Sequence, residues 1–242
     1  MLMRLKNKLA IVTGGSRGIG AATALKLAEE GADVAITFNS SKEKAEKVAA
    51  AIIKLGRKAF IIQADANEPT KVAQAVDDAA KALGGLDILV NNAGVFEAGG
   101  VIGAIDATQF EHQLNVNVRS VFAATQAAVA HLKAGGRIVN VSSCLGERAI
   151  MPGVSAYTMT KFAVAGLTRG WALDLAQQNI TVNAVLPGPI ATDMLPDGAE
   201  QLSPMKRAGK PEEVANVIAF LASSEASYMT GATVTVDGGV NA

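Results

Sequence analysis

The chain has 242 residues, of which 50% are apolar and 18% are charged, enough apolar material for one large domain over residues 1–242. Its 22 basic and 22 acidic residues balance, so no basic surplus indicates nucleic acid or an anionic membrane as a partner. A single cysteine excludes an intrachain disulfide. No apolar run approaches the ~20 residues of a membrane span, and we expect a cytoplasmic protein.

Short runs rich in Val and Ile alternate with longer amphipathic stretches along the whole chain. The runs are apolar on both faces, as strands covered on both sides are. Strands are predicted at 9–13, 33–38, 59–63, 88–90, 137–141, 180–186 and 233–236. Helices are predicted at 19–30, 42–55, 70–83, 108–132, 155–178 and 211–221. Repeated strand–helix units predict an α/β fold: a single doubly wound Rossmann domain with a mostly or fully parallel seven-stranded sheet.

A glycine-rich turn joins the first strand to the first helix. Glycines allow a tight turn and a close approach to a pyrophosphate, and the helix N-terminus offers free N–H groups to the anion. The candidate contacts in this turn are Gly14, Ser16, Arg17, Gly18, Ile19 and Gly20. The spacing is not G-x-G-x-x-G, and the absence of a lysine after Gly20 excludes a Walker A loop.

The longest irregular stretch is residues 187–210, which together with Pro211 holds five prolines. A loop of this length inside a compact domain is often a lid or a binding loop.

Further motifs follow in a characteristic order. They are Asn91-Asn92-Ala93-Gly94 after the fourth strand, Asn117 in the fourth predicted helix, Ser143 after the fifth strand, Tyr157-x-x-x-Lys161, and Pro187-Gly188 after the sixth strand. With the glycine-rich turn, this set resembles the short-chain dehydrogenase/reductase family over essentially the whole chain, nearest to 3-oxoacyl-carrier-protein reductase-like ketoreductases.

The resemblance implies a catalytic set of Asn117, Ser143, Tyr157 and Lys161. It implies cofactor contacts beyond the glycine-rich turn at Asn39, Ser40, Ser41, Asp65, Ala66, Asn92, Ala93, Gly94, Tyr157, Lys161, Pro187, Gly188, Ile190 and Thr192. It also implies a homotetramer, with a dimer as the alternative. No metal is expected, because the two histidines and one cysteine show no metal-ligand spacing.

Reduction of a carbonyl requires a hydride, supplied by the cofactor, and a proton for the oxygen. Tyr157 is the candidate acid. Lys161, four residues later on the same helix face, would favour its phenolate together with the positive nicotinamide of the oxidised cofactor. Ser143 would hydrogen-bond the substrate oxygen, and Asn117 would hold a water that relays protons from Lys161. Ser142 competes with Ser143, and Asn115 with Asn117, for these roles.

The second predicted strand ends at Phe38-Asn39-Ser40-Ser41-Lys42, without the acid that an NAD enzyme usually places there. Arg17, with Asn39, Ser40 and Ser41, is therefore predicted to bind the 2′-phosphate of NADP, with NADPH the preferred form, and Lys42 to add charge.

The predicted function is reduction of a ketone or 3-oxoacyl-type substrate, acyl thioesters included. The candidate apolar pocket residues are Phe96, Leu145, Met151, Met194 and Leu195. The alternative is a non-catalytic nucleotide-binding regulator on the same fold, because a fold does not determine a function.

Overall fold

The computed structural model describes residues 3–99 and 105–242. Seven strands form one sheet in the order β3-β2-β1-β4-β5-β6-β7, and every neighbouring pair is parallel. The strands are β1 (Leu9–Val12), β2 (Asp33–Phe38), β3 (Ala59–Gln63), β4 (Leu86–Asn91), β5 (Leu132–Val141), β6 (Thr181–Pro187) and β7 (Thr233–Val236). The predicted Rossmann-type sheet is confirmed, and it is parallel throughout.

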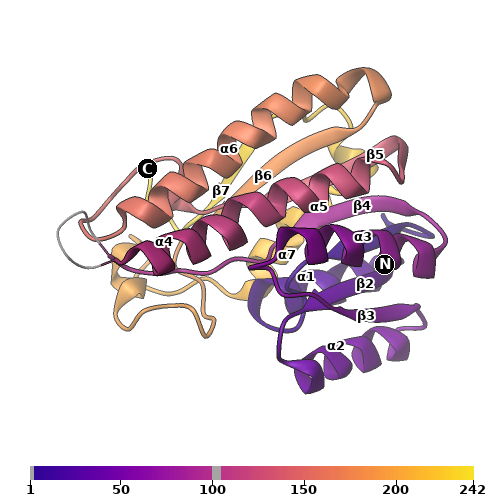
Figure 1. Ribbon diagram of the computed structural model, residues 1–242, viewed down its shortest axis with the longest axis horizontal. Coiled ribbons are helices and arrows are strands. Elements are labelled where there is room, and N and C mark those ends of the chain that lie inside the picture. Colours follow the sequence, from indigo (N-terminus) through magenta and orange to yellow (C-terminus); the bar gives the residue numbers. More distant parts are fainter. Residues whose placement is uncertain (1–2, 100–104) are drawn as a thin grey trace.

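Helices cover both faces of this sheet (Figure 1). One apolar core joins the sheet to α1 (Gly18–Glu29), α2 (Lys42–Lys54) and α7 (Pro211–Leu221). A second core joins it to α3 (Pro69–Leu83), α5 (Ser120–Val129) and α6 (Ser155–Leu175). In β1, Ala10 and Val12 belong to the first core and Ile11 to the second. Successive residues of one strand thus enter opposite cores, which explains the unbroken apolar runs.

The region predicted as one helix over 108–132 differs in the structure. It forms α4 (Ala107–Leu114), a π-helical turn η1 (Asn115–Arg119) and α5. β5 already begins at Leu132, which pairs with Leu86 before a register shift in the ladder. Short π-helical turns are often found at functional sites, and this one carries Asn117.

The order of strands places the switch point of the topology between β1 and β4. Ligands of open α/β sheets bind beyond the carboxyl ends of the strands at such a point. The glycine-rich turn follows β1, and residues 91–94 end and follow β4. The irregular segment 187–210 follows β6 and holds one short 3-10 helix, Ala199–Leu202.

Across residues 3–99 and 105–242, the search for membrane spans finds no helix with the length and apolar character required.

Candidate active site

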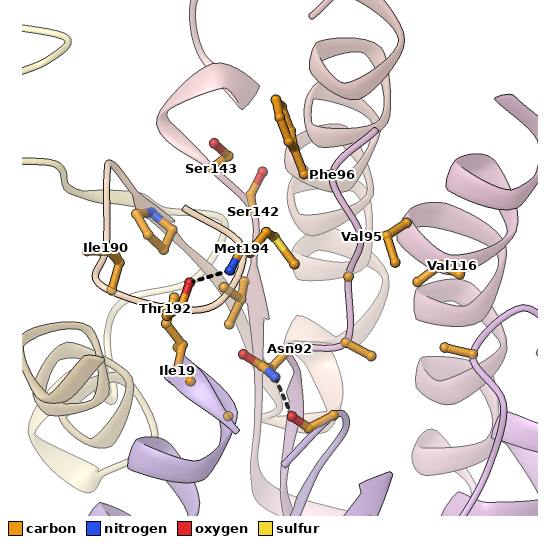
Figure 2. A pocket seen from close by; sticks show the side chains of 18 of the residues that line it. Ile19, Asn92, Val95, Phe96, Val116, Ser142, Ser143, Ile190, Thr192 and Met194 are labelled. Atoms are coloured by element: carbon orange, nitrogen blue, oxygen red, sulfur yellow. Dashed lines mark hydrogen bonds between the residues drawn. The ribbon is translucent and has the colours of Figure 1, made fainter. Parts of the chain in front are cut away.

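A pocket opens at the carboxyl ends of the strands, between the glycine-rich turn, the β5 end and segment 187–210 (Figure 2). Every candidate catalytic or cofactor residue predicted from the sequence lines this pocket, with the exceptions of Asn117 and Lys42. The motifs are spread over nearly the whole sequence and are brought together by the parallel sheet, whose strands all end at one edge.

Hydrogen bonds lock the loops after β1 and β4 together. The Thr13 hydroxyl accepts from the N–H groups of Asn92, at 2.9 Å, and Ala93, at 3.1 Å. The Asn92 amide donates in return to the carbonyls of Thr13, at 2.9 Å, and Gly14, at 3.1 Å. A Cβ on Gly20 would collide with the Gly14 carbonyl and the Asn92 amide. Glycine is required there because the two loops approach too closely for a side chain.

The start of α1 fits the phosphates of a nucleotide. Arg17 is the N-cap residue, and its side chain makes no capping hydrogen bond. The first N–H groups of the helix therefore face the pocket without a side-chain cap, which is the arrangement that binds phosphate. Gly18 has a φ of +53°, and a Cβ on it would lie 3.1 Å from Cγ2 of Thr192. The glycine thus keeps the passage between α1 and segment 187–210 open.

Tyr157 and Lys161 lie one turn apart at the start of α6 and are both buried, with exposed fractions of 9% and 5%. The Tyr157 ring packs edge-on against Phe96, with the ring centroids 4.9 Å apart. The Lys161 ammonium lies 5.5 Å from the centroid of the Tyr157 ring and donates to the Val141 carbonyl at 3.2 Å. The cation is thus held at the end of β5, beside the phenol.

Burial dominates the ionisation of both groups. It raises the pKa of Tyr157 to about 12, an effect that a hydrogen bond with Ser143 opposes in part. Burial lowers the pKa of Lys161 to about 8. Desolvation of the phenolate is the largest cause of the Tyr157 shift. Tyr157 therefore carries its proton at neutral pH. That Lys161 and the oxidised nicotinamide together favour the phenolate stays a prediction.

The side chains of Ser142 and Ser143 have different hydrogen-bond partners in the structure. The Ser142 hydroxyl donates to the Lys161 carbonyl at 2.9 Å inside the fold, whereas the Ser143 hydroxyl accepts from the Leu145 N–H at 3.2 Å and lowers the pKa of Tyr157 in part. Ser143 and Tyr157 are 14 positions apart, and the short 3-10 turn η2 (Cys144–Gly146) and the loop after it join them. The serine beside the phenol is Ser143.

The two asparagines of η1 also differ in their surroundings. Asn117 is fully buried and hydrogen-bonds to the backbone of Val95 and to Thr160. Asn115 bonds instead to Asn67 and Arg119. Asn117 stands behind the pocket wall, where its side chain shapes the loop after β4.

Charged residues gather at the end of the pocket near Asn39, Ser40 and Ser41. Arg17 contacts Asp193 there, at 3.3 Å between Nη1 and Oδ2. Lys42, which was expected to add charge, pairs with Glu46 of its own helix instead, at 3.8 Å. Lys44, two residues later, lies beside Asp193 instead, with its Nζ 3.4 Å from Oδ2 of that residue. Sequence reasoning missed Lys44 and Asp193, since nothing in a local pattern pairs residues so far apart in the chain.

The opposite end of the pocket is apolar. All five candidate residues, Phe96, Leu145, Met151, Met194 and Leu195, line it, together with Ile150, Pro196, Leu202 and Val240. Val240 was not predicted. The C-terminal tail brings it to the pocket, where the neighbouring Asn241 donates to the Cys144 carbonyl at 2.8 Å. His112 also lines the pocket and pairs with Glu97 at 2.7 Å.

Within the described ranges, no group of three or more His, Cys, Asp or Glu residues is placed to hold a metal ion.

Comparison with known proteins agrees with this geometry. Residues 14–241 match a family model described as Enoyl-(Acyl carrier protein) reductase. A 3-oxoacyl-[acyl-carrier-protein] reductase of Staphylococcus epidermidis is 39% identical, over 97% of this chain and 99% of that protein.

Two solved structures are also similar. A short chain dehydrogenase from Burkholderia cenocepacia, in complex with NADP, has a TM-score of 0.96 and 49% identity, over 99% of this chain and 100% of that one. A blue fluorescent protein from a metagenomic library, in complex with NADPH, has a TM-score of 0.95 and 46% identity, over 99% and 100% of the two chains.

Proposed function

The chain belongs to the short-chain dehydrogenase/reductase family of oxidoreductases, and from that premise we propose that it uses NADPH to reduce the carbonyl group of an apolar substrate. The observation that carries the proposal is the meeting of Ser143, Tyr157 and Lys161 between the glycine-rich and the apolar ends of one pocket. The complexes of two similar proteins with NADP and NADPH support the choice of cofactor.

The cofactor would be held by residues 14–20, by Asn92, Ala93 and Gly94, and by Ile190 and Thr192. When bound, it supplies the hydride. The protein supplies the proton and the geometry. Tyr157 holds its proton at Oη because burial raises its pKa to about 12. Ser143 lies near that phenol. Both hydroxyls would donate hydrogen bonds to the substrate carbonyl oxygen, which would orient this oxygen toward the Tyr157 proton.

Lys161 would act after the proton leaves. Its ammonium lies beside the Tyr157 ring and favours the phenolate that remains. With its pKa lowered to about 8, Lys161 is largely charged at neutral pH. Asn117 is assigned a positioning role, because both ends of its amide are engaged inside the protein.

The lining of the apolar end supports an uncharged substrate. Its members are aliphatic, aromatic or sulfur-containing side chains. Apart from Lys161 beside Tyr157, the charged Asp, Glu, Lys and Arg residues that line the pocket are Arg17, Asp65 and Asp193. A ketone or a 3-oxo ester or thioester fits this apolar end, because burying a charged group in an apolar site is costly.

Turnover of a substrate panel tests the proposal. The purified protein is mixed with NADPH and a set of ketones and β-ketoesters, and cofactor oxidation and alcohol product are both measured. We expect equal amounts of oxidised cofactor and alcohol, with a lower kcat/KM for NADH. Binding of NADPH without turnover of any carbonyl would favour the non-catalytic regulator, and reduction of conjugated C=C bonds alone would favour an enoyl reductase.

We also propose that the protein assembles as a homotetramer. Four large apolar side chains are exposed on α5 and α6: Phe122, Met159, Phe162 and Leu173. The two helices come together at Phe122 and Trp171, whose ring centroids are 6.0 Å apart. Gly166 and Gly170, also on α6, leave open space where a Cβ would stand. An apolar face with small residues suits close packing of helices from a second copy across a two-fold axis.

A further inference from the structure

Three residues from distant parts of the chain meet beside the pocket: Arg17 and Asp193 line it, and Lys44 contacts Asp193 from outside the lining. Arg17 belongs to the glycine-rich turn, Lys44 to the first turn of α2, and Asp193 to segment 187–210. A single oxygen, Oδ2 of Asp193, lies 3.3 Å from Arg17 Nη1 and 3.4 Å from Lys44 Nζ. One carboxylate thus holds two cations that no local feature of the sequence links.

All three side chains remain open to a ligand. Their exposed fractions are 58% for Arg17, 55% for Lys44 and 62% for Asp193. Arg17 and Asp193 line the pocket together with the residues after β2, which are Asn39, Ser40 and Ser41. An anion entering this end of the pocket therefore reaches the cations without unfolding any element.

The bridging carboxylate occupies the position that suits an incoming phosphate. A phosphate and a carboxylate accept the same charge-assisted hydrogen bonds from Arg and Lys. The two cations lower the pKa of Asp193, Lys44 more strongly than Arg17, so the group is an anion at neutral pH. A second anion at this point would either replace Asp193 or be repelled by it.

Resting on the proposed function, we propose that Lys44 is a second cation for the 2′-phosphate of NADP beside Arg17, and that this phosphate displaces Asp193 from both. Lys44 and Arg17 then raise the preference for NADP over NAD, and Asp193 lowers it. Lys42 serves as the matched control, since it lies in the same turn of α2 and is directed at Glu46.

The test is isothermal titration of the purified protein with NADP⁺ and with NAD⁺, which differ only in the 2′-phosphate. Lys44→Met should weaken NADP⁺ binding by about three- to tenfold, which is the effect expected for loss of one partly exposed charge pair. It should leave NAD⁺ binding unchanged. Asp193→Asn should tighten NADP⁺ binding by about two- to fivefold. Lys42→Met should change neither affinity beyond about twofold. All three side chains are exposed, so we expect the variants to fold.

The outcomes separate this inference from the proposed function. If Arg17→Ala selectively weakens NADP⁺ while Lys44→Met behaves like Lys42→Met, the role of Lys44 is wrong and the cofactor assignment stands. If Asp193→Asn weakens NADP⁺ binding, Asp193 positions the cations and does not compete with the phosphate. If the unmodified protein binds NAD⁺ as tightly as NADP⁺, the cofactor assignment itself fails.

Discussion

The carboxamide of Asn117 makes two hydrogen bonds to the backbone of one residue, Val95. Its Oδ1 accepts from the Val95 N–H, and its Nδ2 donates to the Val95 carbonyl, each at 2.9 Å. The same Nδ2 also donates to the Thr160 hydroxyl at 3.2 Å, one residue before Lys161. A single side chain in the π-helical turn η1 thus joins the loop after β4 to the helix that carries Tyr157.

Replacement of Asn117 should destabilise this junction. Asn117→Ala leaves the N–H and carbonyl of Val95 without their partners in a largely buried place, and we expect the free energy of unfolding to fall by about 1–3 kcal/mol. Urea denaturation measures the loss. Asn115→Ala is the matched control in the same turn and should cost less, since Asn115 makes no contact with Val95. Equal losses of stability in the two variants would show that the two hydrogen bonds between Asn117 and Val95 contribute little.

Tyr157→Phe should remove most turnover and preserve the fold and NADPH binding. The variant keeps the ring that packs on Phe96 and loses the hydroxyl proposed as the acid. General acid catalysis contributes roughly 10²–10⁴-fold, so kcat should fall by about that factor. Steady-state kinetics on the best ketone of the panel, with NADPH binding measured in parallel, provide the check. A rate close to that of the parent protein would contradict the mechanism.

Lys161→Met should stabilise the fold at neutral pH and lose this advantage in alkali. The folded-state pKa of Lys161 is lowered from 10.5 to about 8, so the unfolded chain binds its proton more tightly than the folded protein. The resulting cost is fully present below about pH 8 and disappears as the pH rises to 10.5. The free energy of unfolding of the variant should rise by at most about 3 kcal/mol at pH 7. Loss of the hydrogen bond to Val141 reduces this gain.

Thermal or urea unfolding of both proteins at pH 7 and pH 10 measures this difference. A gain that is the same at both values would contradict the lowered pKa. A loss of stability at pH 7 would show that the hydrogen bond to Val141 outweighs the desolvation of the ammonium.

Arg17→Ala should reduce kcat/KM for NADPH and leave that for NADH nearly unchanged. A hydrogen bond to a charged group contributes roughly 1.5–3 kcal/mol, but the Arg17 side chain is 58% exposed. We therefore expect a loss of about tenfold, the lower end of that range. Initial rates with both cofactors test it, with Lys42→Ala as the control. Equal losses for the two cofactors would show that Arg17 does not read the 2′-phosphate.

The purified protein should have the mass of a homotetramer by light scattering at micromolar concentration. Leu173→Glu, which places a charge on the exposed apolar face of α6, should give a smaller species. Leu55→Glu is the control, since Leu55 is similarly apolar and 45% exposed but follows α2. A monomeric parent protein, or an assembly unaffected by the charge at position 173, would contradict the proposed interface.

Most elements of the fold could be predicted from local patterns. β2, β3, β7 and α7 have the predicted bounds, because apolar periodicity and the glycines or prolines beside it are properties of neighbouring residues. The prediction failed over 108–132, where Ala-rich sequence is compatible with a continuous helix. The π-helical turn there carries Asn117, which bonds to Val95, a partner 22 residues away in the sequence.

The sequence alone determined the fold class, the order of the motifs and the residue types that meet in the pocket, because each depends on short-range spacing. The tertiary structure decided the surroundings of each close pair: Ser142 bonds to the Lys161 backbone and Ser143 does not, and Asn117 bonds to Val95 and Asn115 does not. It also decided that burial raises the pKa of Tyr157 to about 12. These outcomes depend on the desolvation and hydrogen bonding that a side chain receives from all the elements packed around it, and no local pattern contains that sum.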